Sequence, residues 1–457
     1  MEVVSQAPQP TIKCYHSIQN GAAVKDLYQE FSPASTYFSG KNLQSYNFEN
    51  SIDNFGGSFS FSIKEDVPQK SFSDCFMDSV QPLDIIEISE TGDGQTVDFI
   101  GVVTKISVGG IASNLTKTVT VSGKSIEWLF TFLTINTDIK ACIFQNEGAN
   151  NTFKTDLEKN DGKEGISIKD LVIASFKMFV EQTTKHKEIS NFVIGDVIKK
   201  WYGNDYGDYV VASNEVFAYP ISSNLFENGK INVIDYIKKL LPSPLYEIYG
   251  YIDGKKPKLG FRKAPYDIKE VKAKYKINPV QLTDFTLTRT CEEIYTAFMP
   301  YIEGSSMSPD FYMNVMKAGS VKETGYDYAF SNQEKVKLYG FQLLTCSFAG
   351  YNSDADNPSV DFQKLSVLGN NLKDWFGNLE DMLNGDFTVV NIPDDGYARI
   401  GEWLGFTDGQ FYVHAATHTW NYGDNPMINY QVSRGGKYSN GSFIKLDRLS
   451  QAYREFE

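Results

Sequence analysis

The sequence predicts a β-dominated α+β protein in which two similar antiparallel β-barrel domains flank a helical or mixed insertion. Three observations lead to this prediction. Alternating apolar and polar runs with glycine-rich turns fill residues 35–122, the middle of the chain changes to helical periodicity, and strands return near the C-terminus. The 457 residues are enough for two to four domains with hydrophobic cores of their own.

Short strands are expected throughout the first β-rich segment. Ser58–Ile63 and Lys117–Ser122 alternate at period two, as half-buried strands do, and Val97–Val103 is more continuously apolar. Regularly spaced turns between such strands are typical of a small antiparallel barrel or sandwich. Ser125–Phe130 is expected to close this unit as a short helix. Residues 1–30 are polar and are expected to be an irregular arm.

Helix-start signals mark the middle of the chain. Ser167 and Asp170 have the spacing of a capping box, and an amphipathic pattern follows them. Asn232 and Asp235 open a second helix, which Pro242 ends. We expect these helices to belong to the insertion between the two barrels.

The C-terminal half is expected to begin with a hairpin and to end as a sheet. The hairpin covers Leu245–Arg262, with its turn at Asp253-Gly254, and strand character returns at 282–302. A long helix is predicted over 359–384, with Gly385 at its C-terminal cap. The tail after residue 437 is expected to end in a helix. The last strands are predicted at roughly 386–392, 396–404, 410–420 and 427–433.

Two hairpins of the chain resemble one another. Phe99–Ser107 and Thr118–Gly123 flank a glycine-containing turn, as do Phe411–Thr419 and Asn429–Gly435, and a strand that begins at a proline precedes each hairpin. This similarity predicts a duplicated β-barrel domain. The expected organisation is an N-terminal arm, a first barrel, a helical or mixed insertion, a hairpin that starts the second barrel, a mixed segment with the long helix, the rest of the second barrel, and a tail. Their bounds are 1–30, 31–135, 136–245, 246–302, 303–385, 386–436 and 437–457.

The charge balance excludes several function classes. With 43 Lys and Arg against 57 Asp and Glu, the net charge is −14, which does not fit a protein that grips nucleic acid through phosphate contacts. No apolar stretch approaches the roughly 20 residues that span a membrane, and no signal peptide is recognised. The five cysteines are far apart and form no CxxC pair, so neither a disulfide framework nor a zinc ribbon is expected.

The residues that could perform chemistry favour structural interpretations. His414 and His418 have helical zinc spacing but lie in a predicted strand, where they would be about 13 Å apart, so no metal site is expected. The Asn352-x-Asp354-x-Asp356 segment resembles a calcium loop but lacks its glycine and its closing glutamate.

Catalytic carboxylates are not expected either. Glu292-Glu293 and Asp394-Asp395 are adjacent in strand-like segments, so the two members of each pair would face opposite ways. The tyrosines of the 246–251 hairpin strand, and Tyr326 and Tyr328, are expected to be core or interface residues rather than a platform for sugars or bases. The sequence therefore predicts no catalytic, cofactor-binding or metal-binding residue.

The C-terminal hairpin resembles the end of baseplate hub proteins of contractile phage tails and related injection systems, the tail hub or late control protein family. The similar stretches are Ile400–Trp403, Phe411–Tyr422 and Val432–Gly435. Tyr246–Tyr266 is similar to a hairpin of that family, and the barrel strands from Phe55 to Ser122 are similar to its first barrel. Tyr339-Gly340, Trp375-Phe376 and Asn384-Gly385 agree with it in order. Residues 140–230 and the tail have no counterpart.

The resemblance implies a structural protein with two tube-type barrels in each chain, so that a homotrimer forms a pseudo-sixfold ring. Such a ring joins a sixfold tail tube, or its initiator, to a threefold central spike, and it contacts baseplate wedge proteins. The implied location is the tail baseplate of a virion or injection particle, assembled in the bacterial cytoplasm. No enzyme activity, cofactor, sequence-specific nucleic acid binding or membrane span is implied. An acidic lining that repels DNA phosphates would suit the passage.

Two other functions stay open. A tail-associated cell-wall hydrolase would need a converging acid and base, and would be detected by a peptidoglycan zymogram. A carbohydrate-binding or adhesin module would suit the tyrosine content, and would bind on a glycan array as a monomer.

Overall fold

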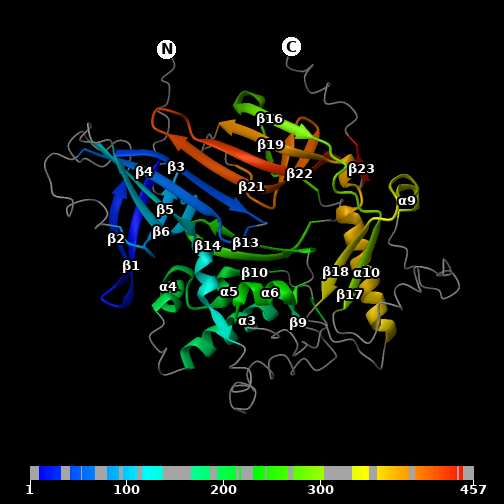
Figure 1. Cartoon of the computed structure of the whole chain (residues 1–457), viewed down its shortest axis with the longest axis horizontal. Helices are drawn as coiled ribbons and strands as arrows, with labels where there is room; N and C mark the ends of the chain where they lie inside the picture. Colours follow the sequence, from blue (N-terminus) through cyan, green and yellow to red (C-terminus); the bar gives the residue numbers. More distant parts are fainter. Residues whose placement is uncertain are drawn as a thin grey trace.

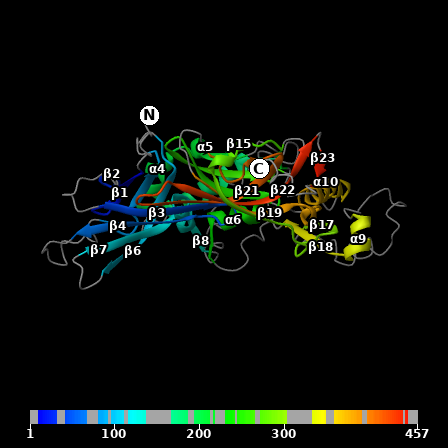
Figure 2. The same cartoon turned by 90° about the horizontal axis from the view of Figure 1, so that it is seen from above.

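A single sheet of 14 strands dominates this computed structural model. In Figure 1 the sheet arches over a group of helices, and a further helical segment lies at one end. Seen from above, the N-terminal strands and that helical segment occupy opposite ends of the molecule (Figure 2). The described residues are 10–31, 42–52, 54–66, 80–91, 96–110, 116–136, 166–185, 193–212, 216–217, 230–241, 244–265, 271–302, 332–348, 358–390, 397–439 and 442–445.

Two five-strand units within this sheet have the same topology. If the strands of each unit are numbered 1 to 5 along the chain, their order across the sheet is 1-2-5-4-3. Every neighbouring pair is antiparallel. The first unit contains β3 (Asn42–Ser51), β4 (Ser58–Asp66), β5 (Ile85–Ser89), β6 (Phe99–Gly110) and β7 (Thr116–Ser125). The second unit contains β16 (Leu282–Thr288), β19 (Leu383–Val390), β20 (Trp403–Phe406), β21 (Gly409–Asn421) and β22 (Met427–Ser439).

The two units share two β-bulges at equivalent positions, although β19 and the start of β21 carry further register shifts that the first unit lacks. The first strand of each unit bulges near its start, at Gln44 in β3 and at Thr283 in β16. The fourth strand bulges where it leaves the third, at Thr104 in β6 and at His414 in β21. Because a bulge is a specific local feature and not an average property of sheets, two shared bulges are strong support for the predicted duplication.

A turn before the third strand is also repeated. In the first unit the backbone N–H of Gln81 donates to the carboxylate of Asp84 at 2.8 Å. In the second unit the N–H of Arg399 donates to the carboxylate of Glu402 at 2.9 Å. The N–H of each carboxylate residue in turn donates to the carbonyl of Gln81 or Arg399, both at 3.1 Å. A turn stabilised by the same hydrogen bond from a backbone N–H to a carboxylate therefore precedes the third strand of each unit.

The residue before each carboxylate has a left-handed backbone. Leu83 and Gly401 both have φ of 75°, and their N–H groups donate to Val103 and Val413 at 2.8 Å. These bonds align Val103 with Val413, so Phe99 corresponds to Gly409 and not to Phe411, with which the sequence comparison began. The duplication is confirmed in topology, with a two-residue offset in this hairpin.

The two units are joined into one sheet, and no sheet of the described residues is closed. Closed barrels are therefore not confirmed, whereas the β-dominated antiparallel architecture is. Short strands extend the sheet beyond the units. They are β1 (Thr11–Gln19) and β2 (Ala22–Phe31) beyond β5, β15 (Tyr275–Lys276) parallel to β20, and β23 (Ser442–Ile444) beside β22.

Three local expectations were wrong. The expected irregular arm is the β1–β2 hairpin, because Ile12, Cys14 and Phe31 are fully buried in the core of the first unit. The long helix ends at Phe376, and Gly385 lies inside β19 rather than at a helix cap. The last strand passes its expected end at 433, because β22 continues to Ser439 and pairs with β23, whereas the expected helix at the end of the tail lies outside the described residues.

Residues between the units form a mixed segment of helices and short strands, which lies beneath the sheet in Figure 1. It extends beyond the expected insertion at 136–245, because the hairpin that was expected to start the second barrel pairs instead with a strand at 210–212 in a separate three-stranded sheet. Asn232 and Ser167 cap its helices as expected, accepting the N–H groups of Asp235 at 2.8 Å and Asp170 at 3.1 Å. Its elements are η3 (Ile126–Phe132), β8 (Thr134–Asn136), β9 (Ile166–Ser167), α3 (Ile168–Lys185), α4 (Val193–Tyr202), α5 (Tyr206–Tyr209), β10 (Val210–Ala212), β11 (Val216–Phe217), β12 (Lys230–Asn232), α6 (Val233–Leu240), β13 (Tyr246–Asp253) and β14 (Lys256–Lys263).

A second insertion separates the first two strands of the second unit. Where the first unit has the short turn 52–57, the second unit has residues 289–382. The elements here are β17 (Ala297–Ile302), α9 (Gln333–Tyr339), β18 (Leu343–Phe348), α10 (Pro358–Phe376) and η8 (Leu379–Asp381), preceded by η7 (Pro279–Gln281) before β16. This insertion makes the two units differ in what they present to the outside.

Candidate functional surface

The two units meet where β21 pairs with β3, which we call the junction. Seven residue pairs connect Ala415–Asn421 with Ser45–Ser51 in antiparallel register. Hydrogen bonds from Ile52 N–H to the His414 carbonyl at 3.0 Å and from Tyr422 N–H to the Gln44 carbonyl at 2.7 Å extend the pairing at both ends. The fourth strand of one unit thus continues into the first strand of the other.

Each unit also inserts a side chain into the core of the other. Trp420 of β21 lies in the core of the first unit and stacks on Tyr46 with ring centroids 5.9 Å apart. Ile52, directly after β3, lies in the core of the second unit. The junction is therefore a packed interface and not only a backbone pairing.

A buried polar cluster crosses the junction. His418 Nδ1 lies 3.1 Å from a carboxylate oxygen of Glu90, which also accepts a hydrogen bond from the Tyr46 hydroxyl at 2.8 Å. Both His418 and Glu90 are almost completely buried, and the imidazole stacks on Phe48 with centroids 4.4 Å apart. Burial, followed by the nearby Glu90 carboxylate, raises the pKa of Tyr46 well above its ordinary value. The phenol therefore stays protonated and serves as a donor.

A second carboxylate supports this cluster. Asp98 accepts hydrogen bonds from the Glu90 N–H at 2.8 Å and from the Tyr397 hydroxyl at 3.1 Å. Desolvation by burial raises the pKa of Asp98, and it also raises the pKa of Tyr397. Glu90 directly follows β5, the third strand of the first unit, and Tyr397 precedes β20, the third strand of the second, so the cluster joins the third-strand regions of both units.

The central hairpin is attached to the second unit by a separate group of polar side chains. Arg262 of β14 donates to Glu247 of β13 at 3.0 Å and to the Tyr412 hydroxyl of β21 at 3.0 Å. It also donates to the carbonyl of Gly401, and its guanidinium lies 5.2 Å from the Tyr249 ring centroid. The predicted interface role of this tyrosine-rich strand is consistent with that contact.

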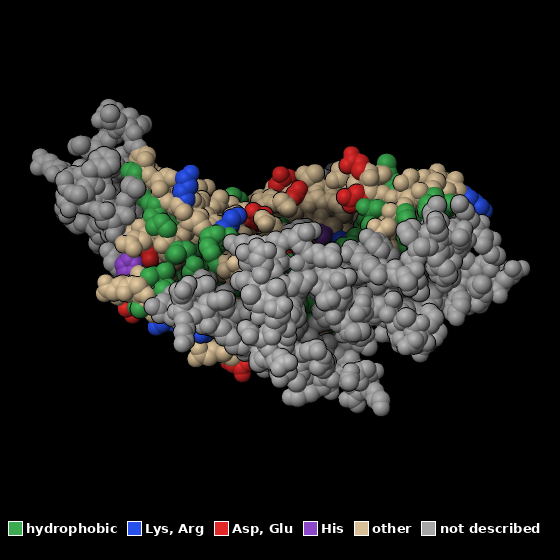
Figure 3. Space-filling model, turned by 60° about the horizontal axis from the view of Figure 1, so that its bottom comes forward, with side chains coloured by type: hydrophobic (Ala, Val, Ile, Leu, Met, Phe, Trp, Pro, Cys, Tyr) green, Lys and Arg blue, Asp and Glu red, His purple; other side chains and the backbone are tan. Residues whose placement is uncertain are grey.

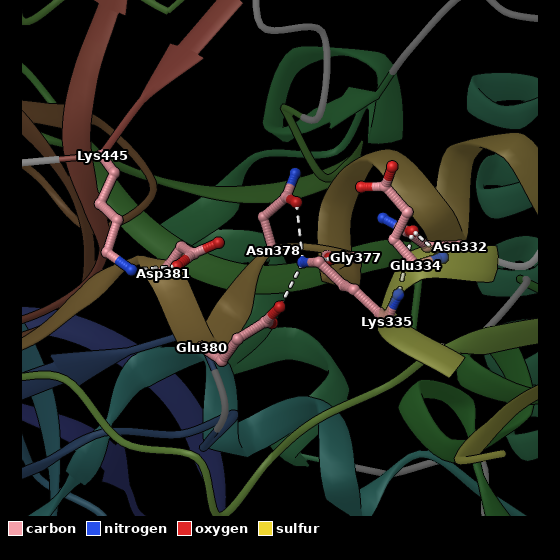
Figure 4. Close-up of polar contacts among 8 residues, drawn as sticks. All are labelled: Asn332, Glu334, Lys335, Gly377, Asn378, Glu380, Asp381 and Lys445. Atoms are coloured by element: carbon pink, nitrogen blue, oxygen red, sulfur yellow. Dashed lines mark hydrogen bonds and ion pairs between the residues drawn. The ribbon is translucent and has the colours of Figure 1, made fainter. Parts of the chain in front are cut away.

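The long insertion is fixed by Lys335 of α9, as Figure 4 shows. Its ammonium group contacts the Glu380 carboxylate, the Gly377 carbonyl at 2.5 Å and the Asn378 side-chain oxygen at 3.0 Å. Glu380 is buried, so this ion pair is shielded from solvent. In the same view Lys445, next to β23, binds Asp381 at 2.5 Å.

One face of the sheet is polar across both units, and we call it the polar sheet face. The strand registers place hydroxyl and amide side chains opposite one another from β16 to β6. Ser60 donates to Asn47 at 2.8 Å, and Asn429 donates to Thr388 at 3.0 Å. Its central rows contain Thr286, Asp386 and Gln431, then Asp284, Thr388, Asn429, Thr417, Glu49, Ser58 and Lys124, and then Met427, Thr419, Asn47, Ser60, Ser122 and Lys105.

The described side chains visible in Figure 3 also form no broad patch of one charge. Lysine or arginine and aspartate or glutamate groups lie there as small separate groups among neutral side chains. Described residues therefore do not show an excess of carboxylates on that side of the molecule.

Only some of the candidate sites weighed from the sequence lie within the described residues. His414 and His418 lie in β21, as expected for a strand, and the described residues contain no cluster of three or more potential metal ligands. His414 Nε2 contacts Ser433 and lies 3.1 Å from Arg434. Glu292 and Glu293 are exposed. The possible calcium loop at 352–356, the carboxylates at 394–395 and the tyrosines at 326 and 328 lie outside the described residues.

Sequence reasoning missed Glu90, Asp98 and Tyr397 because nothing in their local sequence distinguishes them. Their partners across the junction lie hundreds of residues away, as His418 does from Glu90 and Tyr397 from Asp98. The repeated carboxylate turns at Asp84 and Glu402 had a weak signal, since each carboxylate lies three residues after the N–H that it accepts. Among the described helices, none is long and apolar enough to cross a membrane.

Comparison with known proteins gives structural matches only. No protein-family model and no curated protein sequence matches the chain. A tail protein from Neisseria meningitidis MC58 matches with a TM-score of 0.49 and 9% identity, over 93% of this chain and 96% of that one. The 43 kDa tail protein of prophage MuSo2 from Shewanella oneidensis matches with a TM-score of 0.46 and 10% identity, over 93% and 98%.

A third match is the E. coli c3393 protein, described as a type VI secretion component with structural similarity to the T4 tail proteins gp27 and gp5. Its TM-score is 0.41 at 7% identity, over 90% of this chain and 78% of that one. The similar structures are thus phage tail proteins and a type VI secretion component, in agreement with the resemblance found in the sequence. Because every TM-score is below 0.5, the function proposed below rests on the duplicated units of this chain.

Proposed function

We propose that this chain is a structural baseplate hub of a contractile tail or related injection system. In this proposal three copies form a ring with six equivalent units, which adapts a sixfold tail tube to a threefold central spike. The observation that supports it most directly is the junction. Two units of identical topology already continue into one another through β21 and β3 within a single chain.

The architecture also suits the asymmetry that an adaptor needs. The shared strands, bulges and turns supply six similar arcs to a ring of three chains. The insertion at 289–382 occurs in only one unit of each chain, so whatever contacts it meets a threefold pattern. The six similar arcs match a sixfold tube, and the three copies of the insertion match a threefold spike or the surrounding wedge proteins.

The polar sheet face is the surface we assign to the central passage for DNA or effector. Its side chains are mostly hydroxyls and amides, and the charges in its central rows are of both signs without an excess of lysine. A passing polyanion would therefore find little net electrostatic attraction there. The acidic lining expected from the net charge stays a prediction. We assign no catalytic group, and the location that follows is the tail baseplate of a virion or injection particle.

Light-scattering mass measurement tests this function, first with the chain alone and then with the spike and tube proteins encoded beside it. We expect three times the chain mass of 51.4 kDa, and one spike trimer bound to each ring. A chain that stays monomeric with both partners present would refute the hub. Peptidoglycan cleavage in a zymogram would instead support the hydrolase alternative.

A further inference from the structure

Two strand edges at opposite ends of the duplicated sheet have no strand beside them in the described part of the chain. β16 pairs with β19 on one side only. β6 pairs with β7 along its length, but β5 covers its other edge only as far as Val102, and the turn before β5 reaches Val103. Beyond Thr104 that edge of β6 is open. Such an edge presents a row of backbone N–H and C=O groups onto which a strand of another chain can pair.

These two edges are the counterparts of the two strands that form the junction. β6 is the fourth strand of the first unit, as β21 is of the second, and both are bulged at the same point. β16 is the first strand of the second unit, as β3 is of the first, and both again share a bulge. Past its bulge, β21 leaves β20 and pairs with β3. The equivalent part of β6 would then pair with the equivalent of β3, which is β16.

We propose that β6 of one copy pairs with β16 of a second copy, in the register of the junction. Aligning the bulges transfers that register residue by residue. Gly109 then pairs with Thr286 as Thr419 pairs with Asn47, and Ser107 pairs with Thr288 as Thr417 pairs with Glu49. We call this antiparallel pairing the seam. The seam rests on the proposed function for the number of copies, but its register follows from the duplication alone.

The side chains at the seam agree with this register. Val108 and Leu287 fall opposite one another, where the junction has the stacked His418 and Phe48. Val108 packs on the core of the first unit and Leu287 on that of the second, and both are half-buried in the single chain. Pairing would complete their burial. Their neighbours Ser107 and Thr288 would both lie on the polar sheet face, which would therefore continue from copy to copy.

The seam joins different surfaces of the two copies, so it is a head-to-tail contact. From β16 to β6 the sheet has six intervening strands and so seven strand spacings, about 34 Å at roughly 4.8 Å each, and the two edges are not paired with one another in this structure. Head-to-tail contacts close into a ring when the rotation between copies allows it, and otherwise build a filament. Hence the seam and ring closure at three copies can be tested separately.

Disulfide trapping tests the register. The full chain carrying Cys75→Ser, Cys142→Ser and Cys291→Ser, which leaves only the two buried native thiols, receives Ser107→Cys and Thr288→Cys together. Residues directly opposite have Cβ atoms about 4.5–5.5 Å apart, close to disulfide geometry. The matched positive control is Thr417→Cys with Glu49→Cys, the equivalent pair inside one chain. The off-register control is Ser107→Cys with Asp284→Cys, on the same face but four residues along β16.

Mild oxidation followed by non-reducing electrophoresis should link the test pair into covalent dimers and trimers, at least tenfold more than the off-register pair. The positive control should give an intrachain disulfide in the monomer band. Species limited to three chains support both the seam and the trimeric hub. A ladder that continues beyond three supports the seam and refutes closure at three.

If light scattering shows a trimer while only the intrachain control links, the seam is wrong and the hub proposal stands. If the off-register pair links as well as the test pair, the register is wrong. A second variant, Leu287→Lys, places a charge at the half-buried centre of the seam and should lower self-association at least tenfold. Val280→Lys is its control, because Val280 is 91% exposed next to β16 and should leave association unchanged. Equal association of both variants would overturn the proposal.

Discussion

Removing the imidazole of His418 should weaken the junction more than any other single polar change in the described part of the chain. The ring is 2% exposed, lies 3.1 Å from the Glu90 carboxylate and stacks on Phe48. A hydrogen bond to a charged group contributes about 1.5–3 kcal/mol, and loss of one partner of a buried pair costs about 3–5 kcal/mol. We therefore expect His418→Ala to lower the free energy of unfolding by about 3–5 kcal/mol.

A double-mutant cycle isolates the part of this cost that belongs to the pair. Glu90→Gln keeps an acceptor for the Tyr46 hydroxyl while removing the charge that faces His418. The coupling free energy between His418→Ala and Glu90→Gln should be about 1.5–3 kcal/mol. Urea unfolding followed by tryptophan fluorescence measures it, since Trp420 lies buried at the junction.

A second histidine provides the matched control. His16 lies 3.1 Å from Asp84, the same separation, but its side chain is 19% exposed against 3% for His418, and the pair lies within the first unit. Solvent screening should reduce its coupling to about 0.5–1 kcal/mol. Equal coupling for the two pairs, or a coupling below about 0.5 kcal/mol for His418 and Glu90, would refute the view that the buried cluster stabilises the junction.

Three further outcomes follow from the structure. Gly401→Ala should lower the free energy of unfolding by about 3 kcal/mol, because a Cβ at φ of 75° would strike the Arg262 guanidinium. Gly254→Ala, with φ of 65° and open space around it, should lower it by only about 1 kcal/mol, and equal losses in thermal unfolding would contradict this reasoning. Desolvation by burial raises the pKa of Glu127, so its ionised carboxylate destabilises the folded state. The free energy of unfolding of the wild type should therefore fall as pH rises from about 4.5 through that raised pKa, and Glu127→Gln should remove this pH dependence. Iodoacetamide should label the exposed Cys291 of the native protein well before the buried Cys14 and Cys346, as followed by peptide mass spectrometry. Equal labelling rates would show that the burial of these two thiols is wrong.

The strands could be predicted from the sequence because each one has a local pattern. Ser58–Ile63 alternates and lies in β4, and the 245–262 hairpin turns at Gly254 as expected. The β1–β2 hairpin was missed although Asn20-Gly21 is a strong hairpin signal, and both residues have the positive φ of such a turn. Here the signal was present, and the polar composition around it concealed it.

The register and the junction could not be predicted, because they depend on residues without a sequence signature. Gln44 and Thr283 are bulged at the same position, yet one is an amide and the other a hydroxyl. Leu83 and Gly401 share a left-handed backbone with different side chains. His418 was expected to be structural, as it is, but its partner Glu90 could be found only in the folded chain.

The helix before β19 shows the opposite error, a pattern that continued too far. Leucines at 379 and 383 prolong the apolar spacing of α10, whereas the helix ends at Phe376 and Gly377 follows. Tertiary packing decides this boundary, because Leu379 and Leu383 are buried through a 3-10 turn and a strand instead.

The junction has a consequence for synthesis of the chain. β3 leaves the ribosome early, but the strand that covers its outer edge is completed only at Asn421, about 370 residues later. At about 5–20 residues per second that edge, with Tyr46 and Phe48 on it, stays uncovered for roughly 20–70 s. Nascent copies translated side by side on one message would expose the same edge together. Pairing between unfinished chains is therefore the misassembly that this architecture must avoid, and chaperone demand should fall sharply once β21 has emerged.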